Sequence, residues 1–205
     1  MTRQVLPLLI LALWVLPVSA HATTSSASAF VQQKSDEVLG ILRQDVRTNP
    51  AAAEQRRQRL EGLIEATIDY DVLAERSLGR HWEGRSAEER QIFVQLLREL
   101  VQASYGKRLG DASVDASAWR SEITGERARR RATVVEGRVR GQERSVEVEV
   151  HLQQRGEAWM VVDIVTDDVS LQESYAESFD TIIRRDGWDA LITRMRERIS
   201  EMRGA

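Results

Sequence analysis

Apolar side chains recur every three or four positions in the first half of the chain, which is the spacing of amphipathic helices. The pattern predicts a first helix that begins near Phe30 and ends before Asn49-Pro50, since proline disfavours helix at the residue that precedes it. A second helix is expected over about residues 51–67. A short third helix is expected over residues 70–78, because Gly79 is a natural C-terminal cap.

The longest helix is predicted over about residues 87–109. Ser86-Ala87-Glu88-Glu89 forms a capping box, in which the serine hydroxyl and the glutamate side chain satisfy each other's backbone amides. The apolar positions of this helix fall on one face. They are Ile92, Phe93, Leu96, Leu97, Leu100, Val101 and Tyr105.

The period then changes from helical to alternating. In residues 145–153, Val146, Val148 and Val150 alternate with polar neighbours, which is typical of a half-buried strand. We therefore expect these three valines to face the interior of the protein.

Turn residues separate this strand from its neighbours in an antiparallel meander of about four strands. The turns are Gly141-Gln142 and Arg155-Gly156. The neighbouring strands are predicted at residues 131–140, 157–166 and around 119–123. Two helices, at residues 170–185 and 188–202, then close the chain.

Helices, a meander and further helices predict an α+β fold, with helices packed on one face of the antiparallel sheet. No repeat or internal linker interrupts the chain, so residues 23–205 are expected to form one domain. Cysteine is absent, and the fold therefore depends on packing and not on disulfides.

The first 22 residues have the three parts of a secretory signal peptide. Arg3 makes the start basic, residues 5–18 are an apolar run, and Ala20-His21-Ala22 ends on small residues. The run is shorter than the roughly 20 apolar residues of a transmembrane helix, which disfavours a retained anchor. We expect cleavage after Ala22 and a soluble, exported protein.

Few residues are candidates for catalysis or metal binding. Beyond residue 22 the histidines are His81, in a turn, and His151, on the polar side of a predicted strand. Without cysteine or paired histidines a transition-metal site lacks its usual ligands, so neither a metal nor a cofactor is expected. Asp167-Asp168 and Ser170 are interpreted as turn and cap residues, with a carboxylate pair for acid–base chemistry as the alternative.

The charge of the chain indicates no nucleic-acid partner. The formal net charge is −3, and no nucleic-acid-binding module is present. One basic run, residues 127–131 with Arg129, Arg130 and Arg131 at its end, lies between two predicted strands. It is either a solvated hairpin end or a docking surface for a protein or for lipid phosphates.

Two segments carry a family resemblance. The first is residues 69–82, which end in Leu78-Gly79-Arg80-His81-Trp82 and lead into the helix with Phe93. The second is Val161-Val162-Asp163-Ile164, followed by Val169-Ser170-Leu171, Tyr175, Phe179 and Ile182-Ile183. Both resemble the MlaC family of periplasmic phospholipid carriers, also called the toluene-tolerance or Ttg2 family. The family usually has glycine in place of Asp168 and commonly arginine in place of Ala176.

The resemblance implies a monomeric carrier that is not an enzyme. Such a carrier holds the acyl chains of a diacyl phospholipid in an apolar cavity between helices and sheet. It moves the lipid between the two membranes and so maintains the lipid asymmetry of the outer membrane. The implied partners are an inner-membrane ABC transporter complex with a hexameric lipid-binding ring and an outer-membrane lipoprotein–porin complex.

The spacing of apolar residues does not distinguish a cavity lining from a filled core, and the resemblance favours the lining. The residues expected to contact lipid are Leu73, Leu78, Trp82, Phe93, Leu97, Val101, Val146, Val148, Val150, Tyr175, Phe179 and Ile182. Three alternatives stay open. They are a carrier of the hopanoid-associated branch, an NTF2-like scaffold with a solid core, and a hydrolase that uses His81 with an aspartate.

Overall fold

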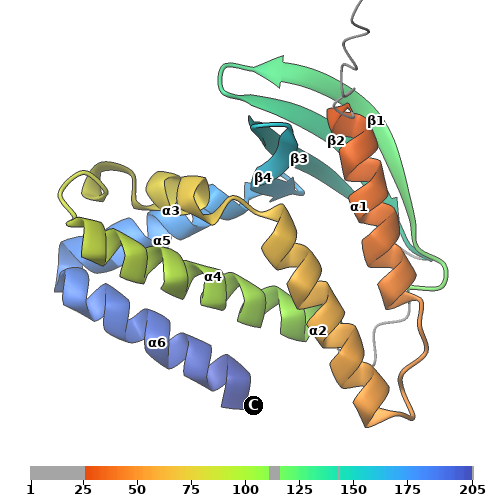
Figure 1. Cartoon of the computed structure of the whole chain (residues 1–205), viewed down its shortest axis with the longest axis horizontal. Helices are drawn as coiled ribbons and strands as arrows, with labels where there is room; N and C mark the ends of the chain where they lie inside the picture. The colour runs from red at the N-terminus through yellow and green to blue at the C-terminus, as the bar shows by residue number, and fades with distance from the viewer. Residues whose placement is uncertain (1–25, 111–115, 143, 205) are drawn as a thin grey trace, which may run out of the picture.

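The computed structural model describes residues 26–110, 116–142 and 144–204, so the predicted signal peptide lies outside the described residues. Helices and strands follow one another in the predicted order (Figure 1). They are α1 (Ala27–Leu42), α2 (Pro50–Thr67), α3 (Tyr70–Leu78), the 3-10 helix η1 (Gly79–His81), α4 (Ala87–Gly110), β1 (Arg120–Arg129), β2 (Ala132–Arg140), β3 (Ser145–Arg155), β4 (Ala158–Thr166), β5 (Val169–Ser170), α5 (Leu171–Asp186) and α6 (Trp188–Gly204).

The strands form one antiparallel sheet in the order β1-β2-β3-β4-β5. The predicted α+β fold is therefore confirmed, with five strands in place of about four. The additional strand, β5, has two residues and is too short for an alternating pattern to reveal it.

Strand β1 is longer than its sequence indicates, because it continues to Arg129. It contains few apolar residues, and its pairing with β2 defines it despite a bulge between Ile123 and Gly125. The arginine run consequently begins inside the strand, where Arg127 donates to Glu149 at 2.8 Å. Arg129, Arg130 and Arg131 are exposed at the hairpin that follows.

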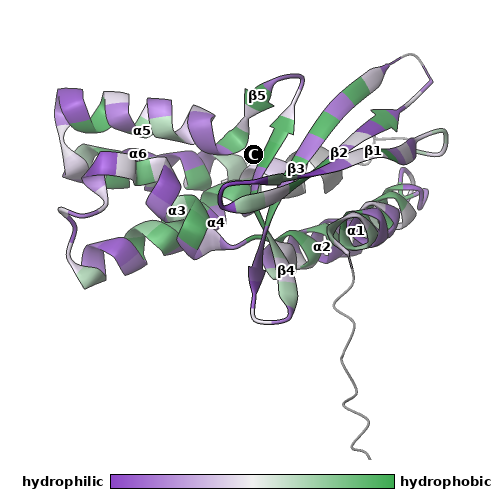
Figure 2. Cartoon of the chain, turned by 90° about the horizontal axis from the view of Figure 1, so that it is seen from above, coloured by the Kyte–Doolittle hydropathy of each residue, from purple (hydrophilic) through white to green (hydrophobic). Residues whose placement is uncertain are grey.

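Helices α1 and α2 lie on one side of the sheet (Figure 2). The N-terminal part of α1 packs directly on the strands, because small and branched residues allow close approach. Ala27 and Val31 of α1 form a buried cluster there with Val135, Leu152 and Val161. Helix α2 contacts β4 but packs mainly against α4.

Helices α3, α4, α5 and α6 form a second layer beside the sheet, called here the helical unit (Figure 1). Phe93 at its centre has no exposed surface and meets Phe179 edge to face, with 5.4 Å between the ring centroids. Phe179 also stacks on Tyr175 at 5.3 Å. Helix α4 packs mainly against α2 and α6, with further contacts to α3.

Strand β4 fixes the helical unit to the sheet. The Asp69 amide, at the start of α3, donates to the carbonyl oxygen of Val161 at 2.9 Å. The buried Asp163 carboxylate accepts from the Ser170 hydroxyl at 2.7 Å and from the Gln172 amide at 2.9 Å. The first turns of α3 and α5 are thus both attached to one strand.

The residues predicted to cap the helices do so in the structure. The Glu89 amide donates to the Ser86 hydroxyl at 3.2 Å, and the Ser86 amide donates to the Glu89 carboxylate at 2.7 Å, which completes the capping box. Ser170 caps α5 by accepting from the Glu173 amide at 3.0 Å. Gly79 ends α3 in the left-handed region, with φ of 49°.

Candidate functional site

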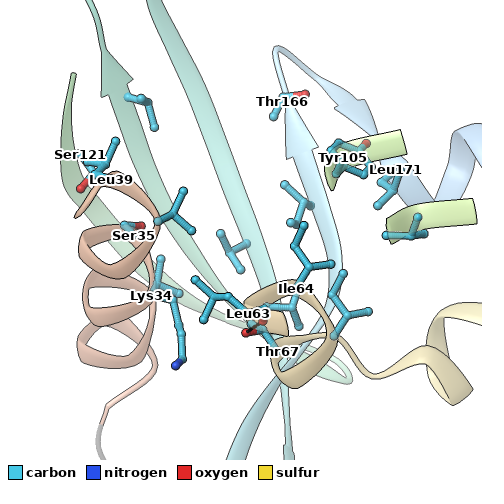
Figure 3. A pocket seen from close by; sticks show the side chains of 18 of the residues that line it. Lys34, Ser35, Leu39, Leu63, Ile64, Thr67, Tyr105, Ser121, Thr166 and Leu171 are labelled. Atoms are coloured by element: carbon cyan, nitrogen blue, oxygen red, sulfur yellow. Dashed lines mark hydrogen bonds between the residues drawn. The ribbon is translucent and has the colours of Figure 1, made fainter. Parts of the chain in front are cut away.

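A cavity of about 500 Å³ opens between α1, α2 and the sheet. Its size lies within the roughly 300–1,000 Å³ that is usual for small-molecule sites. Figure 3 shows the side chains of α1 and α2 facing those of the strands across it. The residues that line it, called here the cavity wall, are Phe30, Val31, Lys34, Ser35, Val38, Leu39, Leu42, Leu63, Ile64, Thr67, Ile68, Val101, Tyr105, Trp119, Ser121, Val139, Val150, Val161, Ile164, Thr166, Val169, Leu171 and Ser174.

The cavity exists because α1 and α2 pack on different partners. Helix α1 is held against the sheet at its N-terminal end, whereas α2 is held mainly against α4. The apolar stripes that the two helices turn toward each other and toward β4 are therefore not filled by a third element. Apolar side chains without partner atoms on one side lose dispersion contacts, which an apolar ligand would restore.

Aliphatic and aromatic side chains make up most of the cavity wall. Two of its hydroxyl groups are engaged locally, since Thr67 donates to the Leu63 carbonyl oxygen at 2.6 Å and Ser174 donates to the Ser170 carbonyl oxygen at 2.7 Å. These hydroxyls are satisfied without water or ligand. Within the described part of the wall, Lys34 is the one charged side chain.

The chain was compared with known protein families. A family model described as MlaC protein matches residues 32–197. The chain belongs to the MlaC family. The resemblance that residues 69–82 and 161–183 indicated is therefore confirmed. A search of curated proteins found no significant match.

The fold of this chain is also seen in a solved structure. That structure is a phospholipid-binding protein from Ralstonia solanacearum in complex with a phospholipid. The two share 20% sequence identity and superpose with a TM-score of 0.73, over 87% of this chain and 99% of the other. At this identity the match establishes the shared fold.

Two of the residues predicted to contact lipid lie in the cavity wall of this MlaC-family protein. They are Val101, near the end of α4, and Val150 on β3. Val146 and Val148 lie on the same sheet face as Val150, because side chains alternate along a strand, but they are outside the wall.

The other eight predicted residues lie in the core of the helical unit and not in the wall. Leu73, Leu78, Phe93, Leu97 and Phe179 are buried there, and Trp82, Tyr175 and Ile182 pack against them. They are placed there because α4 turns its apolar face to α3, α5 and α6, and only its C-terminal end reaches the cavity. A contact of these eight residues with lipid stays a prediction.

The sequence-based site omitted α1 and α2, which supply almost half of the cavity wall. The signal was available, because Val38, Leu63 and Ile64 belong to apolar stripes that the periodicity revealed. A stripe that covers a core and a stripe that covers a cavity have the same period, however.

The two histidines in the described part of the chain, His81 and His151, lie outside the cavity wall. His81 Nε2 lies 2.8 Å from Asp180 Oδ1. Among the interactions that lower the pKa of the Asp180 carboxyl, this hydrogen bond has the largest effect. His151 lies 3.1 Å from Glu149 on the opposite face of β3 from Val150, and lowers the pKa of Glu149. In the described ranges, no three acidic, histidine or cysteine side chains gather to hold a metal ion.

One edge of the cavity is formed by the tight turn between β4 and β5. Asp167 and Asp168 both have left-handed backbones, with φ of 48° and 66°. A positive φ at the second position explains why glycine is usual there in the family, and aspartate is among the residues that tolerate it best. Val169 follows in the cavity wall and is 60% exposed.

Proposed function

We propose that this protein is a periplasmic phospholipid carrier that binds the acyl chains of one diacyl lipid in the cavity between α1, α2 and the sheet. The observation that carries the proposal is the cavity wall itself, which is predominantly aliphatic and aromatic and contains one charge. Membership of the MlaC family and the phospholipid bound to the similar Ralstonia protein support it.

The energetic requirement for such a carrier is large. Two acyl chains contain roughly 30 methylene groups, and at about 0.8 kcal/mol each their exposure to water costs on the order of 25 kcal/mol. A site that shields the chains must therefore be apolar throughout, while the headgroup can remain in water. No covalent step is needed, so the protein acts by binding and release and not as an enzyme.

Location and partners follow from the family. Residues 1–22 would direct export to the periplasm, where the carrier would exchange lipid with an inner-membrane ABC transporter complex and an outer-membrane lipoprotein–porin complex. Among the described helices, none is long and apolar enough to cross a membrane. The hopanoid-associated branch of the family would use the same cavity for a different lipid.

The test is the lipid content of the purified protein. We expect native mass spectrometry and solvent extraction to recover one phospholipid per chain, and delipidated protein to take up phospholipid from vesicles. A protein that is lipid-free from cells and takes up none from vesicles would instead be the non-catalytic scaffold. His81→Ala should leave lipid uptake unchanged, and its loss would favour a role for the His81–Asp180 contact.

A further inference from the structure

Arginine is far more common than lysine in this chain. Of the 29 basic side chains, 27 are arginine, and only Lys34 and Lys107 are lysine. Lys34 is also the charged residue of the described cavity wall. A lysine suits this position, because its unbranched stem can form part of an apolar wall while the ammonium group stays in water.

Lys34 has the exposure that such a role requires. Its side chain is 28% exposed, and its ammonium group forms an ion pair with Glu37 at 2.9 Å. Figure 3 shows Lys34 on the α1 side of the cavity. The cation is thus at the edge of the cavity and not in its depth.

The opposite edge carries the opposite charge. In Figure 3, Thr166 lies across the cavity from Lys34, at the end of β4. The exposed Asp167 and Asp168 follow it directly. A phosphate group would therefore be attracted at the α1 edge and repelled at the turn between β4 and β5.

We infer that Lys34 is a phosphate-binding residue that sets the orientation of the bound lipid, with the phosphate at the α1 edge. This inference rests on the proposed carrier function and adds a headgroup contact to it. Lysine binds phosphate as a point charge, and a phosphate tethered by buried acyl chains has a high effective concentration beside it. Glu37 is 37% exposed and can turn to water when the phosphate replaces it.

The experiment is a competition between two lipids with the same acyl chains. Delipidated protein is incubated with vesicles that contain phosphatidylglycerol and diacylglycerol in equal amounts, and the bound lipids are quantified by mass spectrometry. Diacylglycerol lacks the phosphoglycerol headgroup, so a change in the ratio between the wild type and a Lys34 variant reports the contact between Lys34 and that headgroup.

We expect Lys34→Met to lower the ratio of phosphatidylglycerol to diacylglycerol by about three- to fivefold, which is the upper part of the range for an exposed ion pair. Lys34→Arg should keep the wild-type ratio of the two lipids. Glu37→Gln should raise that ratio, because it removes a carboxylate that competes for the Lys34 ammonium group. Arg59→Gln is the matched control, since it removes one exposed charge from α2 outside the cavity wall.

The outcomes separate this inference from the proposed function. Wild-type protein that takes up neither lipid would contradict the carrier function. Uptake of both lipids with an unchanged ratio in Lys34→Met and Glu37→Gln would overturn the Lys34 site alone. If Lys34→Met does not fold, the Glu37→Gln ratio decides. Calorimetric binding of inorganic phosphate by the delipidated protein, lost in Lys34→Met, would indicate a free-anion site in place of a headgroup site.

Discussion

At the scale of single residues, Val150 of the cavity wall and Phe93 of the core differ in their exposure. Val150 faces the cavity and is half-buried, whereas Phe93 has no exposed surface. Both are apolar residues of a regular element, and the sequence alone assigns them to the same site. Substitutions at the two positions should nevertheless have different consequences.

Val150→Glu is expected to abolish lipid binding and to leave the protein folded, because water in the emptied cavity can solvate the carboxylate that acyl chains could not. Val148→Glu is the matched control on the same strand face outside the wall, and it should retain lipid. The measurements are a thermal melt and lipid extraction for each variant. Lipid retained by Val150→Glu would mean that the acyl chains lie elsewhere.

Phe93→Ala should have the opposite effect, with a loss of stability but no loss of lipid binding. Truncation of this buried ring should reduce the free energy of unfolding by about 3–5 kcal/mol, while the remaining folded protein still contains lipid. A folded Phe93→Ala protein that has lost its lipid would show instead that the helical unit contributes to the binding site.

At the scale of secondary structure elements, periodicity and capping residues predicted almost every helix and strand. The helices at residues 70–78 and 87–109 match α3 and α4 closely, because Gly79 and the Ser86–Glu89 capping box mark their boundaries. The extent of β1 could not be predicted, since its pairing with β2 and not its own alternation makes it a strand.

The partners of the elements could not be predicted either. The apolar stripe of α4 is compatible with packing on a sheet or on other helices, and the distance along the chain does not decide between them. In the structure, the hydrogen bond between Ser170 and Asp163 joins the start of α5 to β4, and α5 packs against α3 and α6. The wall residues of α1 and α2 were missed for the same reason.

Ser170→Ala tests this junction of β4 and α5. The variant removes the hydroxyl that caps α5 and that donates to the buried Asp163, and the free energy of unfolding should fall by about 1–3 kcal/mol. Ser174→Ala, one helical turn later, removes a hydroxyl that donates to the backbone carbonyl of Ser170, and it should change stability much less. Equal effects of the two variants in urea unfolding would contradict a special role for Ser170.

At the scale of the whole molecule, the cavity belongs to the part of the protein with fewer buried contacts. The helical unit has a large continuous core, whereas α1 meets the sheet through a small one. Local stability should therefore differ between the two parts, and lipid should stabilise the α1–α2 part selectively.

Removal of lipid is expected to lower the thermal midpoint by about 5–10 °C, which corresponds to roughly 2.7 kcal/mol for a ligand at 100 times its Kd. Amide hydrogen exchange should increase in α1, α2 and β3, and should remain nearly constant around Phe93 in α4. The same increase in every helix would indicate that the lipid contacts the helical unit as well.

The order of the chain has a consequence for when the protein becomes functional. Ser28, at the start of α1, donates to Glu126 at 3.0 Å across 98 residues of sequence, and the Val31 cluster also requires Val161. Helix α1 is therefore synthesised first among the described elements but gains its packing partners late. A nascent chain that stops before β4 lacks Val161 and Ile164 of the cavity wall, so the cavity can form only after β4 has been synthesised. Its formation depends on contacts between residues that are distant in the sequence, and such contacts form slowly during folding.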